Sequence, residues 1–433
     1  MKIVGLIAEY NPFHNGHLYH IKKALEITGA DAALVVMSGN YVQRGTPAIM
    51  PKHLRAKVAL ESGVAAVIEL PVCYATGSAE YFASGAVSLL DNLGCVDALC
   101  FGSECGDYTL LERIAKILIE EPEDYTFYLK EALRKGLSFP RARQQALSFY
   151  LKDESIDQVL NEPNNILGIE YIKALYTRNS SIKGYTIKRK LSGYHDDELN
   201  DSLSSASAIR KLLAQAGSSI HLRSDSIYDE PPLSDVLTRL EDQVPHSCIQ
   251  LLRDTHLIRY PIYANDFSLL LKYRLLTEDF HSLMKYLDLT EDLTNRIRNH
   301  ADDFITFEQF CDLIKSRDLT YTRISRSLLH ILLEVKTSDL VEYEANGGCQ
   351  YAHILGFRKD QSTLLTKLKR TAKIPLLTKL TQTDELTDVG VRMLETDIQA
   401  ANLYESVITD KFKIPFYNEY RHQIVRIEED DLF

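Results

Sequence analysis

The first hundred residues alternate between apolar runs and segments of helical periodicity, and this alternation constrains the fold more than any other feature. The apolar runs have the length of buried strands, and between them hydrophobic residues recur at three- and four-residue spacing. Strands that alternate with helices predict a parallel sheet with right-handed crossovers. The expected strands are residues 2–8, 32–37, 65–71 and 96–102, and the expected helices are 16–28, 52–62 and 78–93.

The remaining chain is mostly helical in pattern, and its 433 residues suffice for more than one domain. Residues 216–232 are polar and proline-rich, which is typical of a linker. We therefore expect an α/β fold with a Rossmann-like parallel-sheet domain over residues 1–215. A mostly helical domain would follow over residues 233–433, with short strands at CQYAHILGF and KIPLLTKL.

Composition restricts the compartment and the partners. The seven cysteines form no CxxC pair and no cluster with zinc-ligand spacing. No apolar run approaches the roughly 18 residues of a membrane span. The net charge of −11 argues against a protein whose whole surface is basic and binds nucleic acid, although it permits a local basic patch. We expect a cytoplasmic protein with reduced thiols, with no membrane or DNA partner and no bound metal at a dedicated site.

Polar segments follow three of the expected strands, namely YNPFHNGH, SGNYVQRG and FGSE. Ligands of open parallel sheets bind beyond the carboxyl ends of the strands. We therefore expect these three segments to meet at one edge of the sheet and to form the site.

The segment HNGH, residues 14–17, opens the first helix after a proline-containing turn. A helix N-terminus offers free N–H groups and the positive end of the helix dipole, and both suit phosphate. Gly16 would let a phosphate approach the backbone. The imidazoles of His14 and His17 can donate hydrogen bonds to phosphate oxygens as charge develops. Zinc fits less well, because no third or fourth ligand lies near in the sequence.

The stretch AEYNPFHNGHLYHI resembles the HxGH signature of the nucleotidyltransferase superfamily, which binds ATP and attacks its α-phosphorus. SSASAIRKLL, residues 204–213, resembles the superfamily's second signature, a serine-rich turn before a helix. It has Ala206-Ser207 in place of the usual Ser-Thr, but it keeps a hydroxyl and Arg210. The resemblance implies catalytic roles for His14, His17, Ser207 and Arg210.

Further segments match one family: VVMSGNYVQRGTPAIMPKHLRAKVAL, IELPVCYATGSAEYFASGAV, LCFGSE, PNNILGIEYIKAL, TIKRK, YTRISRSLLHILL and AHILGFRK. With the two signatures they resemble the bacterial tRNA-Met cytidine acetate ligases. The resemblance implies that ATP and acetate form acetyl-adenylate and pyrophosphate. The acetyl group then passes to N4 of the wobble cytidine, position 34, of elongator tRNA-Met and gives N4-acetylcytidine. ATP is then a substrate, and Mg²⁺ is expected to neutralise its charge.

The resemblance also implies the ATP-binding residues. The loop after the first strand would wrap the nucleotide, and Gly102 would let adenosine pack against backbone. The Asn of PNNILG and the Arg of TIKRK are assigned to Asn164 and Arg189, with Asn165 and Lys190 as adjacent alternatives. Taken alone, PNNILG is also typical of a helix cap and KRK of a solvated surface. The expected set is Ile7, Ala8, Glu9, Tyr10, Asn11, Pro12, Phe13, His14, Asn15, Gly16, His17, Leu18, Tyr19, His20, Gly102, Asn164 and Arg189.

The polar loop MSGNYVQRGTPA is expected at the same sheet edge, where it would contact acetate or the target cytidine. Its glycines suit turns, so a purely structural loop is the alternative. Glu9 and Glu104 also belong to this edge, without an assigned role. The candidate contact residues of the loop are Ser38, Asn40, Gln43 and Arg44.

Positive charge is concentrated late in the chain, where residues 315–373 hold 11 lysines and arginines against 6 acidic residues. Cations with an interleaved aromatic suit RNA, because they can contact phosphates while a base stacks on the ring. A solvated helix face would show the same charge pattern. The residues expected to bind tRNA are Lys315, Arg317, Tyr321, Arg323, Arg326, Arg358, Lys359, Lys369 and Arg370.

Two other functions compete with this interpretation. A nucleotidyltransferase that joins ATP to a phosphate-bearing coenzyme precursor would use the same α-phosphorus chemistry without needing tRNA. A non-catalytic RNA-binding protein on a decayed fold would need neither ATP nor an intact HNGH segment. The presence of His14, His17, Ser207 and Arg210 together argues against decay.

Overall fold

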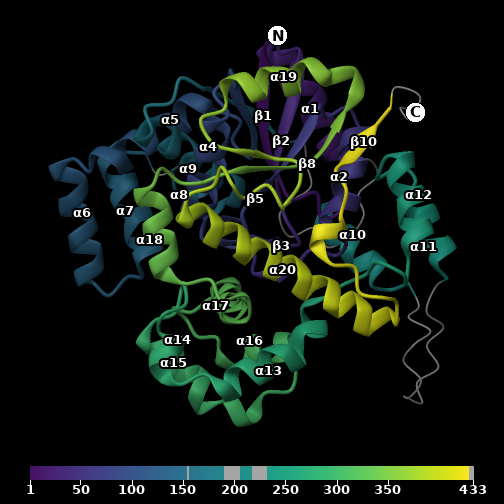
Figure 1. Ribbon diagram of the computed structural model, residues 1–433. Helices are drawn as coiled ribbons and strands as arrows, with labels where there is room; N and C mark the ends of the chain where they lie inside the picture. The colour runs from purple at the N-terminus through teal and green to yellow at the C-terminus, as the bar shows by residue number, and fades with distance from the viewer. Residues whose placement is uncertain (154–155, 190–204, 217–231, 429–433) are drawn as a thin grey trace.

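Strands from both halves of the chain form one sheet at the centre of the structure (Figure 1). The structure is a computed structural model and describes residues 1–153, 156–189, 205–216 and 232–428. The strands of the main sheet are β1 (Ile3–Ala8), β2 (Ala32–Ser38), β5 (Ala66–Leu70), β6 (Ala98–Ser103), β7 (Lys183–Lys188), β8 (Ala352–Arg358), β9 (Leu376–Leu377) and β10 (Val425–Ile427). A separate hairpin consists of β3 (Tyr41–Val42) and β4 (Thr46–Pro47).

The first part of the sheet is the predicted parallel arrangement, in the order β5-β2-β1-β6-β7. The strand order reverses at β1, because the chain moves to β2 on one side and later to β6 on the other. Alternate residues of the strands enter two cores: Leu34 and Val36 face one side, and Val35 and Met37 face the other. Such two-sided burial explains why these strands are continuous apolar runs. The point of reversal is where such sheets bind ligands.

The C-terminal half extends this sheet with strands of opposite direction. β8 pairs antiparallel with β5, and β9 and β10 each pair parallel with β8. The two short strands expected at CQYAHILGF and KIPLLTKL are therefore present and join the N-terminal sheet. The helical character of the later chain is confirmed. The division at residues 216–232 stays a prediction, since most of that segment lies outside the described residues.

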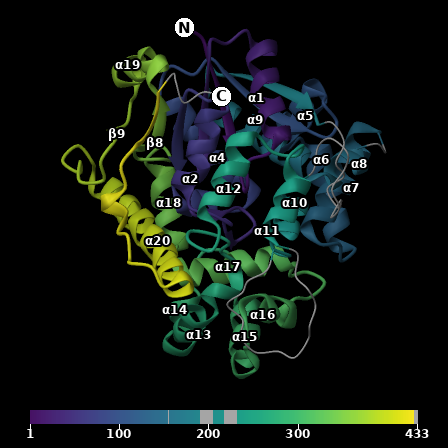
Figure 2. The ribbon, with the colours of Figure 1, turned by 90° about the vertical axis from the view of Figure 1, so that its right-hand side faces the viewer.

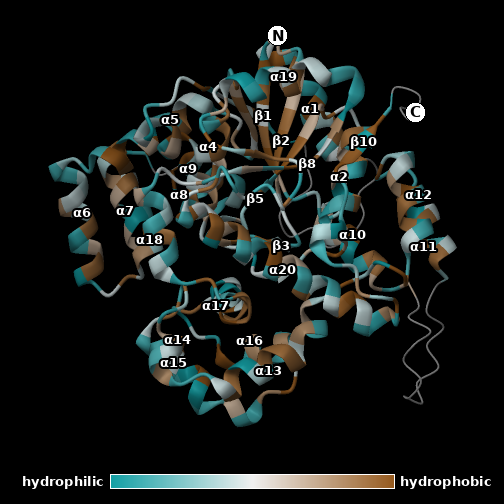
Figure 3. Ribbon diagram, viewed as in Figure 1, coloured by the Kyte–Doolittle hydropathy of each residue, from teal (hydrophilic) through white to brown (hydrophobic). Residues whose placement is uncertain are grey.

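Helices cover both faces of the sheet (Figures 1 and 2). Figure 3 shows the strands as predominantly hydrophobic, as burial under two helix layers requires. One core packs α1 (Asn15–Thr28), α2 (Lys52–Glu61), α10 (Ala206–Leu213), α11 (Leu233–Leu240) and α12 (His246–Thr255). The other packs α3 (Val72–Ala75), α4 (Ala79–Asn92), α5 (Tyr108–Glu120), α6 (Glu123–Arg134), α7 (Phe139–Leu151), α8 (Ile156–Asn161), α9 (Pro163–Thr177), α18 (Thr337–Ala345), α19 (Ser362–Thr371) and α20 (Asp388–Phe412).

A third core lies among helices at the lower end of Figure 1. Part of α17 (Tyr321–Leu333) packs into this third core. Leu329 and Leu332 of the same helix pack into the core that contains α4 and α9, so α17 connects the bundle of lower helices to the sheet domain. None of the described helices is long and apolar enough to cross a membrane. All seven cysteines are described, and all are free. The bundle consists of α13 (Ser268–Thr277), α14 (Phe280–Leu283), α15 (Glu291–Asn299), α16 (Phe307–Ile314) and α17 (Tyr321–Leu333).

Candidate active site

The chain reverses sharply between β1 and α1. Tyr10 adopts a left-handed backbone conformation with φ of 48°. The rings of Tyr10 and Phe13 pack 4.8 Å apart, and both are buried. Asn11 is buried as well, and its Oδ1 accepts a hydrogen bond from the backbone N–H of Ile49 at 2.8 Å. These side chains therefore fix the turn, so any contact from them to a nucleotide would come from their backbone.

The two predicted catalytic histidines cap the helix that they begin. His14 is the N-cap of α1, and its Nδ1 accepts a hydrogen bond from the Gly16 backbone N–H at 3.1 Å. His17 Nδ1 accepts in return from the backbone N–H of His14 at 3.2 Å. This reciprocal arrangement is a capping box built from imidazoles. The two rings stack with their centroids 3.7 Å apart.

The caps also decide which ring nitrogen carries a proton. Each Nδ1 accepts a backbone hydrogen bond, so a neutral ring must carry its proton on Nε2. Burial, reinforced by the charges of Arg189 and Arg210, lowers the pKa of His14 to about 3. Burial is also the main cause that lowers the pKa of His17. At neutral pH both histidines are uncharged Nε2–H donors.

The second predicted signature lies against the first. The Arg210 guanidinium of α10 donates from Nη1 to the carbonyl oxygen of Asn11 at 2.6 Å. Its Nη2 donates to Ser207 Oγ at 3.1 Å. Ser205 is the N-cap of α10, and its hydroxyl accepts from the Ala208 N–H at 3.1 Å. A cation and a helix N-terminus thus adjoin the histidine turn. Residues 190–204, including Lys190 and Ser204, lie outside the described residues.

The remaining predicted nucleotide contacts gather beyond β6 and β7. The Arg189 backbone N–H donates to the carbonyl of Ser103 at 2.9 Å, and Nη1 donates to Asn164 Oδ1 at 3.4 Å. A Cβ added to Gly102 would lie 3.3 Å from Arg189 Cγ, so the glycine leaves room for that side chain. Asn164 and Arg189 are therefore neighbours, whereas Asn165 is buried and bonded to backbone of other segments.

Glu104, which had no assigned role, caps the N-terminus of α9. Its carboxylate oxygens accept from the Asn164 side-chain amide at 2.5 Å and from the Asn165 backbone N–H at 2.9 Å. A carboxylate at a helix N-terminus is favoured by the helix dipole. Glu104 therefore fixes the position of Asn164. Its place directly after a strand was the only sequence signal for this role.

The loop after β2 divides into a buried and an accessible part. Ser38 is fully buried, and Asn40 uses its Oδ1 to accept from the backbone N–H of Lys52 at 2.8 Å. Gln43 and Arg44 lie at the tip of the β3–β4 hairpin, where the Gln43 backbone N–H donates to Glu9 Oε1 at 2.9 Å. Asn40 thus fixes the start of α2 through its Oδ1, and Gln43 and Arg44 lie in the more accessible part of the loop.

A buried arginine that the sequence did not indicate joins the ends of β1 and β2. Arg55 of α2 is 1% exposed and donates hydrogen bonds to the backbone carbonyls of Glu9, Ser38, Gly39 and Met50. A guanidinium can satisfy several carbonyls at once because its five N–H groups form a rigid fork. Arg55 therefore holds the two loops of the site together from beneath.

The residues predicted to bind tRNA fall into two separate groups. Lys315, Arg317, Tyr321, Arg323 and Arg326 lie at the end of α16 and the start of α17, in the lower half of Figures 1 and 2. Arg358, Lys359, Lys369 and Arg370 lie at the end of β8 and on α19, at the upper end of both views. Because β8 is antiparallel to β5, its last residue lies at the sheet edge opposite the histidine turn.

Salt bridges occupy several of these cations. Lys315 pairs with Asp312 at 2.7 Å, and Arg326 pairs with Asp288 at 2.9 Å. Arg358 pairs with Asp360, and Lys359 pairs with Glu428. Tyr321 is half-buried against the core of the lower helices. Within the described chain, no acidic partner is found for the guanidinium groups of Arg317 and Arg323.

Comparison with known proteins places this site in a family. Residues 1–418 match the family model described as HIGH Nucleotidyl Transferase. A tRNA(Met) cytidine acetate ligase of Acetivibrio thermocellus is 42% identical over 407 residues, which cover 93% of this chain and 94% of the relative. The chain belongs to the tRNA(Met) cytidine acetate ligase family. A ligase of this name from Clostridium perfringens is 39% identical over 93% of this chain and 95% of its own length.

The fold of this family member agrees with a solved structure of a relative. The crystal structure of Thermotoga maritima TmcAL bound with alpha-thio ATP is 32% identical and superposes with a TM-score of 0.86. The match covers 99% of this chain and 100% of that chain. The predicted α/β fold and the predicted family are therefore confirmed. The roles of individual residues remain predictions that rest on the geometry above.

Proposed function

We propose that the chain is an ATP-dependent tRNA(Met) cytidine acetate ligase. It joins acetate to the α-phosphate of ATP and then passes the acetyl group to N4 of the wobble cytidine of elongator tRNA-Met. The observation that carries the proposal is the meeting of two neutral Nε2–H donors, Arg210 and Arg189 at the point where the strand order reverses. The relatives' shared name and the ATP analogue of the solved structure support it.

In the first step an acetate oxygen attacks the α-phosphorus, and the bond from that phosphorus to the bridging oxygen breaks. Pyrophosphate leaves, and acetyl-adenylate remains. Negative charge grows on the phosphate oxygens in the transition state, and preorganised donors stabilise such charge. We assign this role to His14 and His17 through Nε2–H, and to Arg210. Ser207 adds a hydroxyl beside Arg210. In the second step the cytidine N4 bonds to the acetyl carbon, loses a proton, and AMP leaves.

Mg²⁺ would enter with the phosphates of ATP rather than at a protein site. The carboxylate of Glu104 is occupied by the α9 N-terminus, and Glu9 accepts from Gln43. Among the described residues, the only group of three potential ligand side chains lies elsewhere, at His53. We also propose that the reaction takes place in the cytoplasm, where its tRNA substrate is available.

The tRNA would approach over α17, because this helix lies next to the site. Gly45 of the β3–β4 hairpin packs against the backbone of Arg326, and Ser325 Oγ donates to the Gly45 carbonyl at 2.8 Å. Arg323 lies on this helix three residues before Arg326, and Arg317 lies in the segment that precedes the helix. An anticodon-loop base is already outside a duplex, so it can be extracted at small cost.

The test is incorporation of label from radioactive acetate into unmodified elongator tRNA-Met in the presence of ATP. Label in N4-acetylcytidine, absent when position 34 is uridine, is the expected result. Folded protein that places no label in RNA would contradict the proposal. Pyrophosphate release from ATP with nicotinamide mononucleotide or phosphopantetheine, and none with acetate, would favour the coenzyme-precursor alternative.

A further inference from the structure

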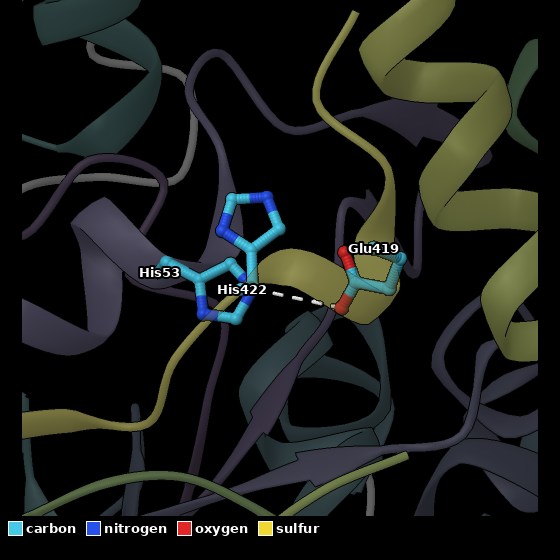
Figure 4. Close-up of side chains that lie close together, drawn as sticks. All are labelled: His53, Glu419 and His422. Atoms are coloured by element: carbon cyan, nitrogen blue, oxygen red, sulfur yellow. Dashed lines mark ion pairs between the residues drawn. The ribbon is translucent and has the colours of Figure 1, made fainter. Parts of the chain in front are cut away.

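A second histidine cluster lies where the C-terminal segment crosses the start of α2. His53 is in the first turn of α2, Glu419 begins the short helix η4 (Glu419–Arg421), and His422 follows it. One nitrogen or oxygen atom from each of the three side chains lies within 4.8 Å of the other two. Figure 4 shows the two imidazoles together, with the Glu419 carboxylate beside them. None of these residues takes part in the proposed reaction.

The cluster contains buried polar atoms that the protein does not hydrogen-bond. Both ring nitrogens of His53 and Nε2 of His422 have no hydrogen-bond partner among the described residues. The nearest carboxylate oxygens are only at ion-pair distance, 3.5 Å from His53 Nε2 and 3.8 Å from His422 Nε2. Buried polar atoms normally have hydrogen-bond partners, so several without a partner in one place need an explanation. A small cavity also adjoins the cluster, and His53, His353, Glu419 and His422 line it.

The carboxylates around the cluster outnumber the permanent cations, and this balance of charge favours a bound cation. Lys52 Nζ lies 2.8 Å from one oxygen of Glu419 and 2.7 Å from Glu69, and Arg259 pairs with Glu405 at 2.6 Å. Three carboxylates thus lie beside two permanent cations, and His353 Nδ1 lies 2.8 Å from Glu69 Oε2. Lys52 contacts Oε1 of Glu419, and Oε2 remains for another partner. Glu405 Oε2 is likewise buried without a hydrogen bond to any described residue, and Glu405 is the carboxylate nearest to His422 Nε2. Glu405 could therefore supply a fourth ligand.

Two imidazoles and a carboxylate, with water or a second carboxylate as the fourth ligand, are a donor set that zinc accepts. We propose that His53, Glu419 and His422 bind one divalent transition-metal ion of zinc-like chemistry. The ion would fasten the C-terminal segment that carries β10 to α2. Ligand atoms now up to 4.8 Å apart would draw closer on binding, and the stacked rings, 4.1 Å apart, would splay.

The first test measures zinc binding by the full-length protein after treatment with a chelator. Titration of Zn²⁺ in competition with a chromophoric chelator should show one equivalent bound. His53→Ala and His422→Ala should each weaken binding by about 100-fold or more, beyond the usual cost of losing an outer-shell partner. His281→Ala, at an exposed histidine of α14, is the matched control and should bind like the wild type. No stoichiometric binding, or equal binding by all four proteins, would overturn the proposal.

The second test needs no variant, so a substitution that prevents folding does not affect it. Wild-type protein loaded with one equivalent of Zn²⁺ is examined by zinc K-edge X-ray absorption, which reports the type of ligand. Scattering from two imidazole rings together with oxygen ligands is the expected result. Sulfur ligands, or fewer than two imidazoles, would place the bound ion elsewhere. Neither test uses the ligase reaction, so its outcome is independent of the proposed function.

Discussion

His17 has two tasks that depend on different ring atoms. Its Nδ1 caps α1 by accepting from the His14 backbone, and its Nε2 is the proposed donor to the α-phosphate. An asparagine places an oxygen near the position of Nδ1, whereas a glutamine places an N–H near that of Nε2. The two substitutions therefore separate the structural task from the chemical one.

We predict that His17→Asn keeps the fold and lowers kcat by about 10²- to 10³-fold, the usual cost of one transition-state donor. His17→Gln should lose about 1 kcal/mol of stability with the cap but retain more activity. Acetate-dependent exchange of pyrophosphate into ATP measures the first step, and thermal unfolding measures the cap. Equal loss of activity in both variants would show that Nε2 is not the group that matters.

His20 gives a prediction for the pH dependence of stability. Burial, with the charge of Arg189, lowers its pKa to about 4, and its Nε2 is buried without a hydrogen-bond partner among the described residues. The unfolded chain takes up this proton near pH 6.5, so it binds more protons than the folded chain between pH 6.5 and about 4. The stability linked to a neutral His20 is thus complete above pH 6.5 and is lost as the pH falls through this interval.

We therefore expect the stability difference between wild type and His20→Gln to shift by about 2 kcal/mol against the wild type between pH 7.5 and pH 5.0. Urea unfolding at the two pH values measures this difference in stability. The contributions of the carboxylates, which both proteins share, cancel in the difference. A difference that does not depend on pH would mean that His20 titrates normally in the folded protein.

At the level of elements, the strand and helix pattern predicted the parallel part of the sheet, because period and polarity are local properties. The same reasoning placed HNGH, the hairpin and Glu104 at one edge, since parallel strands end on the same side. Arg55 could not be found this way. Its four carbonyl partners belong to other segments, and nothing local distinguishes it from an exposed arginine on an amphipathic helix. The antiparallel pairing of β8 with β5 joins strands far apart in sequence, which no local pattern encodes.

Arg55→Met should destabilise the protein by at least about 4 kcal/mol, because it leaves several buried carbonyls without donors at about 1–3 kcal/mol each. Arg55→Lys should cost less, since an ammonium keeps three donors but not the fork. Arg253→Met, at an exposed position of α12, is the control and should change stability by about 0.5 kcal/mol or less. Denaturant unfolding measures all three. A similar small effect in every variant would contradict the role assigned to Arg55.

The hairpin and α17 meet at Gly45, where φ is +77° and a Cβ would lie 2.3 Å from the backbone nitrogen of Arg326. We predict that Gly45→Ala displaces the hairpin from α17 and lowers acetylation of tRNA more than formation of acetyl-adenylate. Gly136→Ala is a matched control, because its φ is +81° and no atom lies within 4 Å. Both variants place an alanine in a left-handed backbone conformation, but only Gly45→Ala disturbs the contact between the hairpin and α17. Equal loss of both half-reactions in Gly45→Ala would contradict this coupling.

For the whole molecule, the division of the basic residues decides how a tRNA could bind to an acidic protein. In the proposed reaction the anticodon loop must reach the carboxyl edge of the sheet, where Arg323 lies on α17 and Arg317 lies in the segment before it. Lys369 and Arg370 lie on α19 near the opposite edge. A tRNA docked at the site would contact the second group only if its body extended along the protein past the sheet.

We predict that Arg317→Ala with Arg323→Ala raises the KM for tRNA by about tenfold or more and reduces its salt dependence by about one unit of slope for each lost phosphate contact. Lys369→Ala with Arg370→Ala removes the same charge at the far edge and should leave both quantities within about twofold of wild type. Initial rates of tRNA acetylation at several salt concentrations measure the two quantities. If both pairs weaken binding equally, the tRNA must cross from one sheet edge to the other. The sequence-based expectation that residues of both groups bind tRNA would then hold despite their separation.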